Sequence, residues 1–167
     1  MKLPLTLAAA AAFSATIAFV TPAEAQRGDA MMFVARAGAS DLYEIQSSQI
    51  AMRRARDPRV RAMAAMLVRD HRRTTAQVAA AARAAGLRPR VPMLEPRQRM
   101  MISQLNRASA RSFDRVYLSQ QIPAHQEALG MVRDYAASGG VPSLRRAAAG
   151  AVPVVEGHLE HARRLQR

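Results

Sequence analysis

Four long stretches of this chain repeat apolar residues at intervals of three and four, and proline or glycine stands at their boundaries. This spacing places the apolar side chains on one face of an α-helix. No stretch alternates polar and apolar residues with the period of two that is typical of a half-buried strand. The pattern therefore predicts an all-α fold in which each helix buries one apolar face.

The residues at the boundaries predict where the helices begin and end. Asp57 before Pro58 is typical of a capped helix start, and Gly86 is typical of a helix end. Ser112 and Pro142 predict two further starts. We expect helices at about residues 30–56, 58–85, 97–107, 113–137 and 142–167, with a proline-containing loop at 86–96. Together they predict a four-helix bundle of two helical hairpins, joined by a longer crossover that contains a short helix.

The first 25 residues have the order of a cleavable secretory signal. Met1-Lys2 precedes an apolar run, and Ala23-Glu24-Ala25 provides the small residues of a cleavage site before Gln26. We therefore expect residues 1–25 to be removed and residues 26–167 to form one domain, exported to the periplasm or associated with the outer membrane. The alternative is that the apolar run stays as a membrane anchor. The chain has no cysteine, which excludes disulfides and thiolate metal sites, so packing must stabilise the domain.

The chain is strongly basic, with a formal net charge of +13. Such an excess favours polyanions, and in the envelope these are anionic lipid and lipopolysaccharide. The arginines are spread along every segment with no aromatic residues between them, which argues against nucleic-acid binding. Two interpretations stay open: a surface that binds anionic lipid or lipopolysaccharide in a structural or stress-related protein, or simply solvated helix faces.

Each long helix carries one polar residue within its apolar stripe. His71, His125 and His158 occupy three of the helices, and Glu44 occupies the first. All four lie at similar distances from their helix starts, so we expect them in one layer near the middle of the bundle. The layer has three interpretations: a site for a small ligand or for a transition metal such as zinc, copper or iron, a structural layer of hydrogen-bonded groups, or unrelated placements.

Two neighbouring residues are assigned lesser roles. His161 follows His158 by three positions, so it is either an additional ligand or an exposed histidine near the chain end. Asp70 precedes His71 and points about 100° away from it around the helix, which predicts a surface ion pair with a nearby arginine.

The chain contains no phosphate-binding glycine loop, nucleophile elbow or HExxH sequence. We therefore expect a binding protein rather than an enzyme, and the sequence specifies neither the ion nor an oligomeric state.

Several segments together resemble one bacterial family. They are residues 60–71 (VRAMAAMLVRDH), 113–118 (FDRVYL) and 152–162 (VPVVEGHLEHA), with Phe33 and Glu44 ahead of them. The family is known as predicted outer-membrane proteins, is catalogued as domain of unknown function four-one-four-two, and is grouped with ferritin-like bundles. The resemblance implies an exported helical bundle.

The ferritin-like grouping does not imply a di-iron centre. Di-iron bundles carry a Glu-x-x-His pair on each of two helices. The residues three positions before His71, His125 and His158 are valine, isoleucine and valine. A carboxylate-rich di-iron site is therefore not expected.

Overall fold

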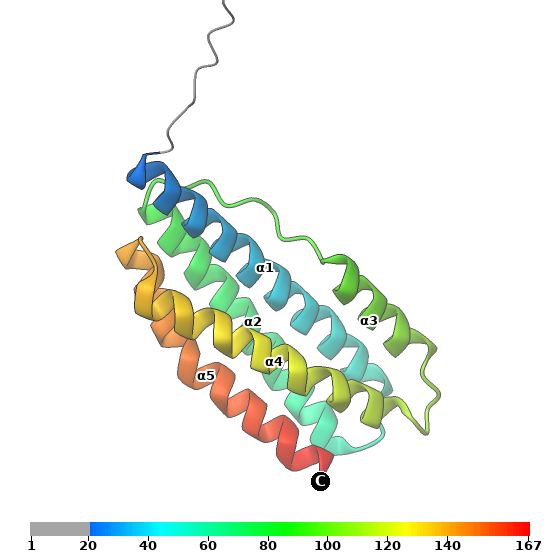
Figure 1. The fold of residues 1–167 in the computed structure, drawn as a ribbon. Helices are drawn as coiled ribbons and strands as arrows, with labels where there is room; N and C mark the ends of the chain where they lie inside the picture. The colour runs from blue at the N-terminus through cyan, green and yellow to red at the C-terminus, as the bar shows by residue number, and fades with distance from the viewer. Residues whose placement is uncertain (1–20) are drawn as a thin grey trace, which may run out of the picture.

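The structure is a computed structural model that describes residues 21–167 as a bundle of α-helices (Figure 1). The elements are α1 (Pro22–Arg54), α2 (Pro58–Ala84), α3 (Pro96–Arg107), α4 (Phe113–Ser138) and α5 (Pro142–Gln166). No strand occurs within this range, so the all-α prediction is confirmed. None of the helices in residues 21–167 combines the length and the apolar character needed to cross a membrane.

The four long helices pair as two hairpins, α1 with α2 and α4 with α5 (Figure 1). The hairpins meet through two contacts, α2 against α5 and α1 against α4. The crossover after α2 returns along α1, and its short helix α3 lies against α1 and α4. This is the predicted bundle of two hairpins joined by a crossover with a short helix.

The predicted boundaries hold within a few residues, with two differences. Asp57 caps α2 by accepting a hydrogen bond from the backbone of Arg59 (2.7 Å), and Gly86 follows the helix with a positive φ of 69°. Ser112 stands at the N-cap position of α4, but its side chain makes no capping bond. It contacts the hydroxyl of Ser109 instead (2.9 Å). Ser112 is thus the N-cap residue of α4, as the predicted start requires, but without a capping hydrogen bond from its side chain.

Helix α1 begins eight residues earlier than predicted. Thr21 and Glu24 form a capping box, in which the Thr21 backbone donates to the Glu24 carboxylate (2.9 Å) and the Glu24 backbone donates to the Thr21 hydroxyl (3.3 Å). The first turn of α1 thus consists of residues that the predicted cleavage before Gln26 would remove. Residues 1–20 of the predicted signal lie outside the described residues, and the cleavage stays a prediction.

The core has two apolar parts with a polar layer between them. One part lies toward the start of α1 and includes the stacked rings of Phe33 and Tyr135. The other lies toward the turn between α1 and α2 and includes Leu67, Leu105 and Phe113. The buried polar residues of the described bundle are Asp41, Glu44, Ser47, Ser48, His71, Gln120, Gln121, His125 and His158. Burying so many polar groups is unfavourable unless each has a hydrogen-bond partner. This layer is therefore the part of the core that apolar packing alone does not explain.

Candidate metal centre

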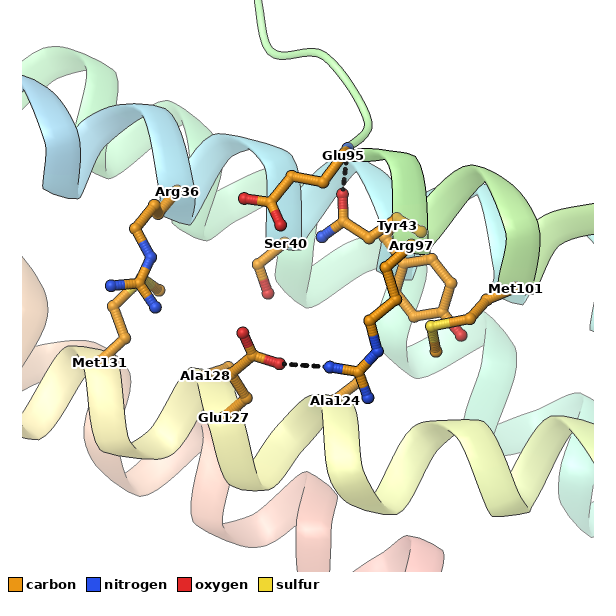
Figure 2. Close-up of a pocket in the computed structure, with 11 residues that line it drawn as sticks. Arg36, Ser40, Tyr43, Glu95, Arg97, Met101, Ala124, Glu127, Ala128 and Met131 are labelled. Atoms are coloured by element: carbon orange, nitrogen blue, oxygen red, sulfur yellow. Dashed lines mark hydrogen bonds and ion pairs between the residues drawn. The ribbon is translucent and has the colours of Figure 1, made fainter.

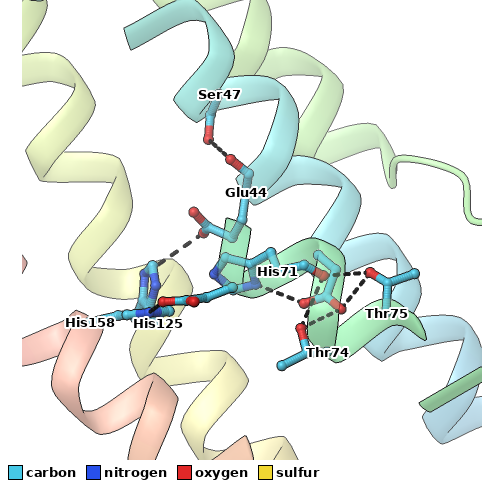
Figure 3. A network of polar contacts seen from close by, with 9 residues as sticks. Glu44, Ser47, His71, Thr74, Thr75, His125 and His158 are labelled. Carbon is cyan, nitrogen blue, oxygen red and sulfur yellow. Dashed lines mark hydrogen bonds and ion pairs between the residues drawn. The ribbon is translucent and has the colours of Figure 1, made fainter. Parts of the chain in front are cut away.

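Three histidines from three different helices meet in the polar layer (Figure 3). His71 comes from α2, His125 from α4 and His158 from α5, and none is more than 3% exposed. Their ring centroids lie 5.3–5.7 Å apart. The end of α1, the starts of α2 and α4 and the end of α5 lie at one end of the bundle. Glu44 and the three histidines each lie about two to four turns from that end, so they are at similar heights.

The ring of His71 is oriented by a carboxylate on α1. Its Nδ1 donates to Asp41 at 2.8 Å, because an ionised carboxylate can only accept. Asp41 also accepts from the hydroxyls of Thr74 (3.0 Å) and Thr75 (2.8 Å), both on α2. Three donors thus fix Asp41, and Asp41 in turn fixes the His71 ring with Nε2 directed away from it.

The other two rings are oriented in the same manner. His125 donates from Nδ1 to the backbone carbonyl of Gln121 (2.9 Å), and His158 donates from Nε2 to Asp70 (3.1 Å). Asp70 is held by Arg73 at 2.6 Å on its other oxygen. In each ring one nitrogen therefore carries the hydrogen, and the other keeps its lone pair when the imidazole is neutral.

The remaining nitrogens are the ones available to a ligand. Nε2 of His71, Nε2 of His125 and Nδ1 of His158 are buried and have no hydrogen-bond partner among residues 21–167. One ring nitrogen from each of the three histidines lies within 4.8 Å of those of the other two. Such a group of converging imidazoles, each with a hydrogen-bonded second nitrogen, is typical of a metal centre.

Glu44 lies beside this group but outside it. Its Oε1 is 3.8 Å from Nδ1 of His125, and its Oε2 has no partner in the described part of the chain. Burial raises the pKa of Glu44 to about 7, although the nearby charge of His71 opposes the rise. Near neutral pH the carboxyl can therefore be present in either form, and it is placed to balance added positive charge.

The three histidines differ in how readily they bind a proton. Burial lowers the pKa of His125 to about 3, and repulsion from His71 contributes to the decrease. Burial also lowers the pKa of His158. Burial by itself would lower the pKa of His71 too, but the hydrogen bond to Asp41 and the charge of Glu44 outweigh it and raise that pKa. A metal ion requires all three rings to be neutral, so protonation of His71, the ring whose pKa is raised, competes with metal binding.

The structure places the residues predicted from the sequence as follows. Glu44, His71, His125 and His158 are all buried in one layer, whereas His161 is half-buried and is not among the three grouped histidines. Whether any of these residues binds a metal stays a prediction.

Two carboxylates of the site were not predicted from the sequence. Asp70 does pair with an arginine, as expected, but its second oxygen also contacts His158. Asp41 was missed altogether. The available signal was its position three residues before Glu44, on the same side of the helix.

Comparisons with known proteins agree with this architecture. A family model described as domain of unknown function (DUF4142) matches residues 17–165. The fold is similar to that of CopM in its Cu(I)-bound form, with a TM-score of 0.69 and 21% identity, covering 81% of this chain and 93% of CopM. CopM in its Cu(II)-bound form gives 0.69 and 20% identity, covering 83% of this chain and 95% of CopM.

A DUF305 fragment from Deinococcus radiodurans is similar as well. Its TM-score is 0.71 at 19% identity, covering 88% of this chain and 97% of the fragment. None of the curated proteins matches the chain. At these identities the similarity to solved structures shows the fold alone.

Proposed function

We propose that this chain, which belongs to the family described as domain of unknown function DUF4142, binds one transition-metal ion between His71, His125 and His158. One observation carries the proposal: three buried rings approach one another within 4.8 Å through one nitrogen each, and each ring has one hydrogen-bonded nitrogen and one without a partner in residues 21–167. In this proposal the protein binds the ion without catalytic turnover.

The donor set indicates which ions suit the site. Three imidazoles favour zinc, copper or iron over magnesium and calcium, which prefer oxygen ligands. A tetrahedral ion holds two ligand nitrogens about 3.3 Å apart, with bonds of about 2.0–2.1 Å. One nitrogen of each ring lies within 4.8 Å of those of the other two, so small side-chain rotations would be enough to reach that spacing. The copper-bound forms of CopM make copper, beside zinc, the first ion to test.

A purely structural polar layer accounts less well for the same residues. Its members would satisfy one another, as Ser48 does with Tyr117 (2.8 Å) and Tyr43 with Gln120 (3.0 Å). Leaving one buried polar atom unpaired costs about 1–3 kcal/mol, and three unpaired nitrogens stand together here. A bound cation removes all three costs at once.

Metal content and affinity of untagged protein test the proposal. We expect one Zn²⁺ or Cu²⁺ per chain, together with a higher melting temperature when the ion is present. His71→Ala, His125→Ala and His158→Ala should each abolish stoichiometric binding and the metal-dependent part of the stability. His161→Ala is the matched control and should bind normally. Equal loss of stability in the three variants with and without metal, or absence of binding by the unaltered protein, would contradict the proposal.

We also propose that the protein works in the bacterial envelope. The support is the signal-like order of residues 1–25, which carries a cleavage pattern at Ala23-Glu24-Ala25. Because the chain contains no cysteine, the metal ligands available to it in that compartment are imidazoles and carboxylates, not thiolates.

A further inference from the structure

A small apolar cavity lies beside His71, one of the three histidines. Its lining includes His71 and Asp41, together with Thr74, Ala128 and Val155. Thr74 follows His71 by three positions, Ala128 follows His125 by three, and Val155 precedes His158 by three. Because three residues are about one helical turn, the cavity occupies the level next to the histidine layer, on the side toward the start of α1.

A groove opens to the surface between α1, α3 and α4 (Figure 2). Arg36 of α1, Glu95 and Arg97 from the start of α3, and Glu127 of α4 surround it. Figure 2 shows the ion pair between Arg97 and Glu127 (3.3 Å) spanning the groove, with Ser40 further along it.

The groove and the cavity share part of their walls. Ser40 of α1 and Ala128 and Met131 of α4 line both of them. These three residues therefore border both the groove and the cavity, and two of them have small side chains. We propose that metal ions reach the three histidines through this groove, and that Ser40, Ala128 and Met131 form its neck. This inference rests on the metal-binding function proposed above.

Charge favours this route over the other groove that approaches the site. That second groove lies under the crossover and reaches Asp41, with Arg83 and Arg90 in its lining. The proposed entrance instead has carboxylates of Glu95 and Glu127 beside its arginines. Its two carboxylates balance its two arginines, whereas the second groove has two arginines against one carboxylate, so on a chain with a net charge of +13 a cation is repelled less at the proposed entrance.

Rates of metal exchange test the route. Co²⁺ uptake is followed by its visible absorbance and Co²⁺ release by transfer to EDTA, with the equilibrium Kd measured separately. Ser40→Leu adds bulk at the neck without touching a proposed ligand. We expect uptake and release both to slow by roughly tenfold while Kd stays the same, because a barrier changes both rates equally. Met131→Ala widens the neck and should accelerate both.

Matched variants separate this route from the alternatives. Ser40→Ala removes the hydroxyl without adding bulk and should exchange like the unaltered protein. Ala79→Leu fills the groove under the crossover, which Ala79 lines, and should have no effect. Unchanged rates in Ser40→Leu and Met131→Ala, or slowing by Ala79→Leu instead, overturn the route while leaving metal binding intact. Absence of Co²⁺ and Zn²⁺ binding in the unaltered protein overturns the proposed function itself.

Discussion

The carboxyl group of Glu44 provides a sharp test of how the layer is stabilised. Burial raises its pKa to about 7, against 4.5 for an ordinary glutamate. Between these two pH values the native state holds a proton that the unfolded chain has already released. Stability therefore falls as pH rises through this window, and the loss amounts to about 3 kcal/mol by pH 8.

Glu44→Gln removes the ionisation and keeps nearly the same shape. We expect the variant to gain stability relative to the unaltered protein as pH increases, with the difference between them growing by about 3 kcal/mol from pH 4.5 to pH 8. Urea unfolding followed by far-ultraviolet circular dichroism, in the presence of a chelator, measures it. Contributions of residues distant from Glu44 are common to both proteins and cancel in the difference.

The control for this experiment is Glu160→Gln, a carboxylate on α5 whose side chain is 70% exposed. It should leave the pH profile of stability unchanged. A difference between Glu44→Gln and the unaltered protein that is equal at both pH values would refute the argument, because it would show that Glu44 ionises without cost. Saturating Zn²⁺ should diminish the pH effect in the unaltered protein, since a cation beside Glu44 favours the ionised form.

Other consequences are simpler to test. Asp41→Asn should weaken Zn²⁺ affinity by about 10–100-fold in chelator competition, because it loosens the orientation of a ligand ring; the exposed change Asp134→Asn should not, and equal affinities would contradict the role of Asp41. Leu105→Ala should cost about 2–5 kcal/mol in urea unfolding, because Leu105 anchors α3 in the core; a negligible cost would mean that α3 contributes little. Binding to anionic vesicles should disappear near physiological salt, since scattered arginines create only a screened field, and persistence at higher salt would reveal a focused surface. Intact mass of protein from its native envelope should show a chain that starts at Gln26; retention of residues 1–25 would rule out the signal.

Local chemistry made much of the fold predictable from the sequence. Asp57-Pro58 starts a helix and Gly86 ends one because capping groups and backbone freedom act over a few residues. The same holds for the inward orientation of Glu44 and the three histidines. A residue within an apolar stripe at helical spacing must share the buried face, whichever helix lies opposite.

The periodicity of apolar residues predicted neither the start of α1 nor the hydrogen-bond partners of the histidines. A capping box between Thr21 and Glu24 extends α1 into a segment whose composition is typical of a signal. Asp41 lies 30 positions from His71, and Asp70 lies 88 positions from His158. Whether such pairs meet depends on how two helices are rotated against each other and which side-chain rotamers the packing allows. The sequence therefore determined that three imidazoles face the core, but only the packed bundle decided which nitrogen of each ring is hydrogen-bonded and which has no partner among residues 21–167.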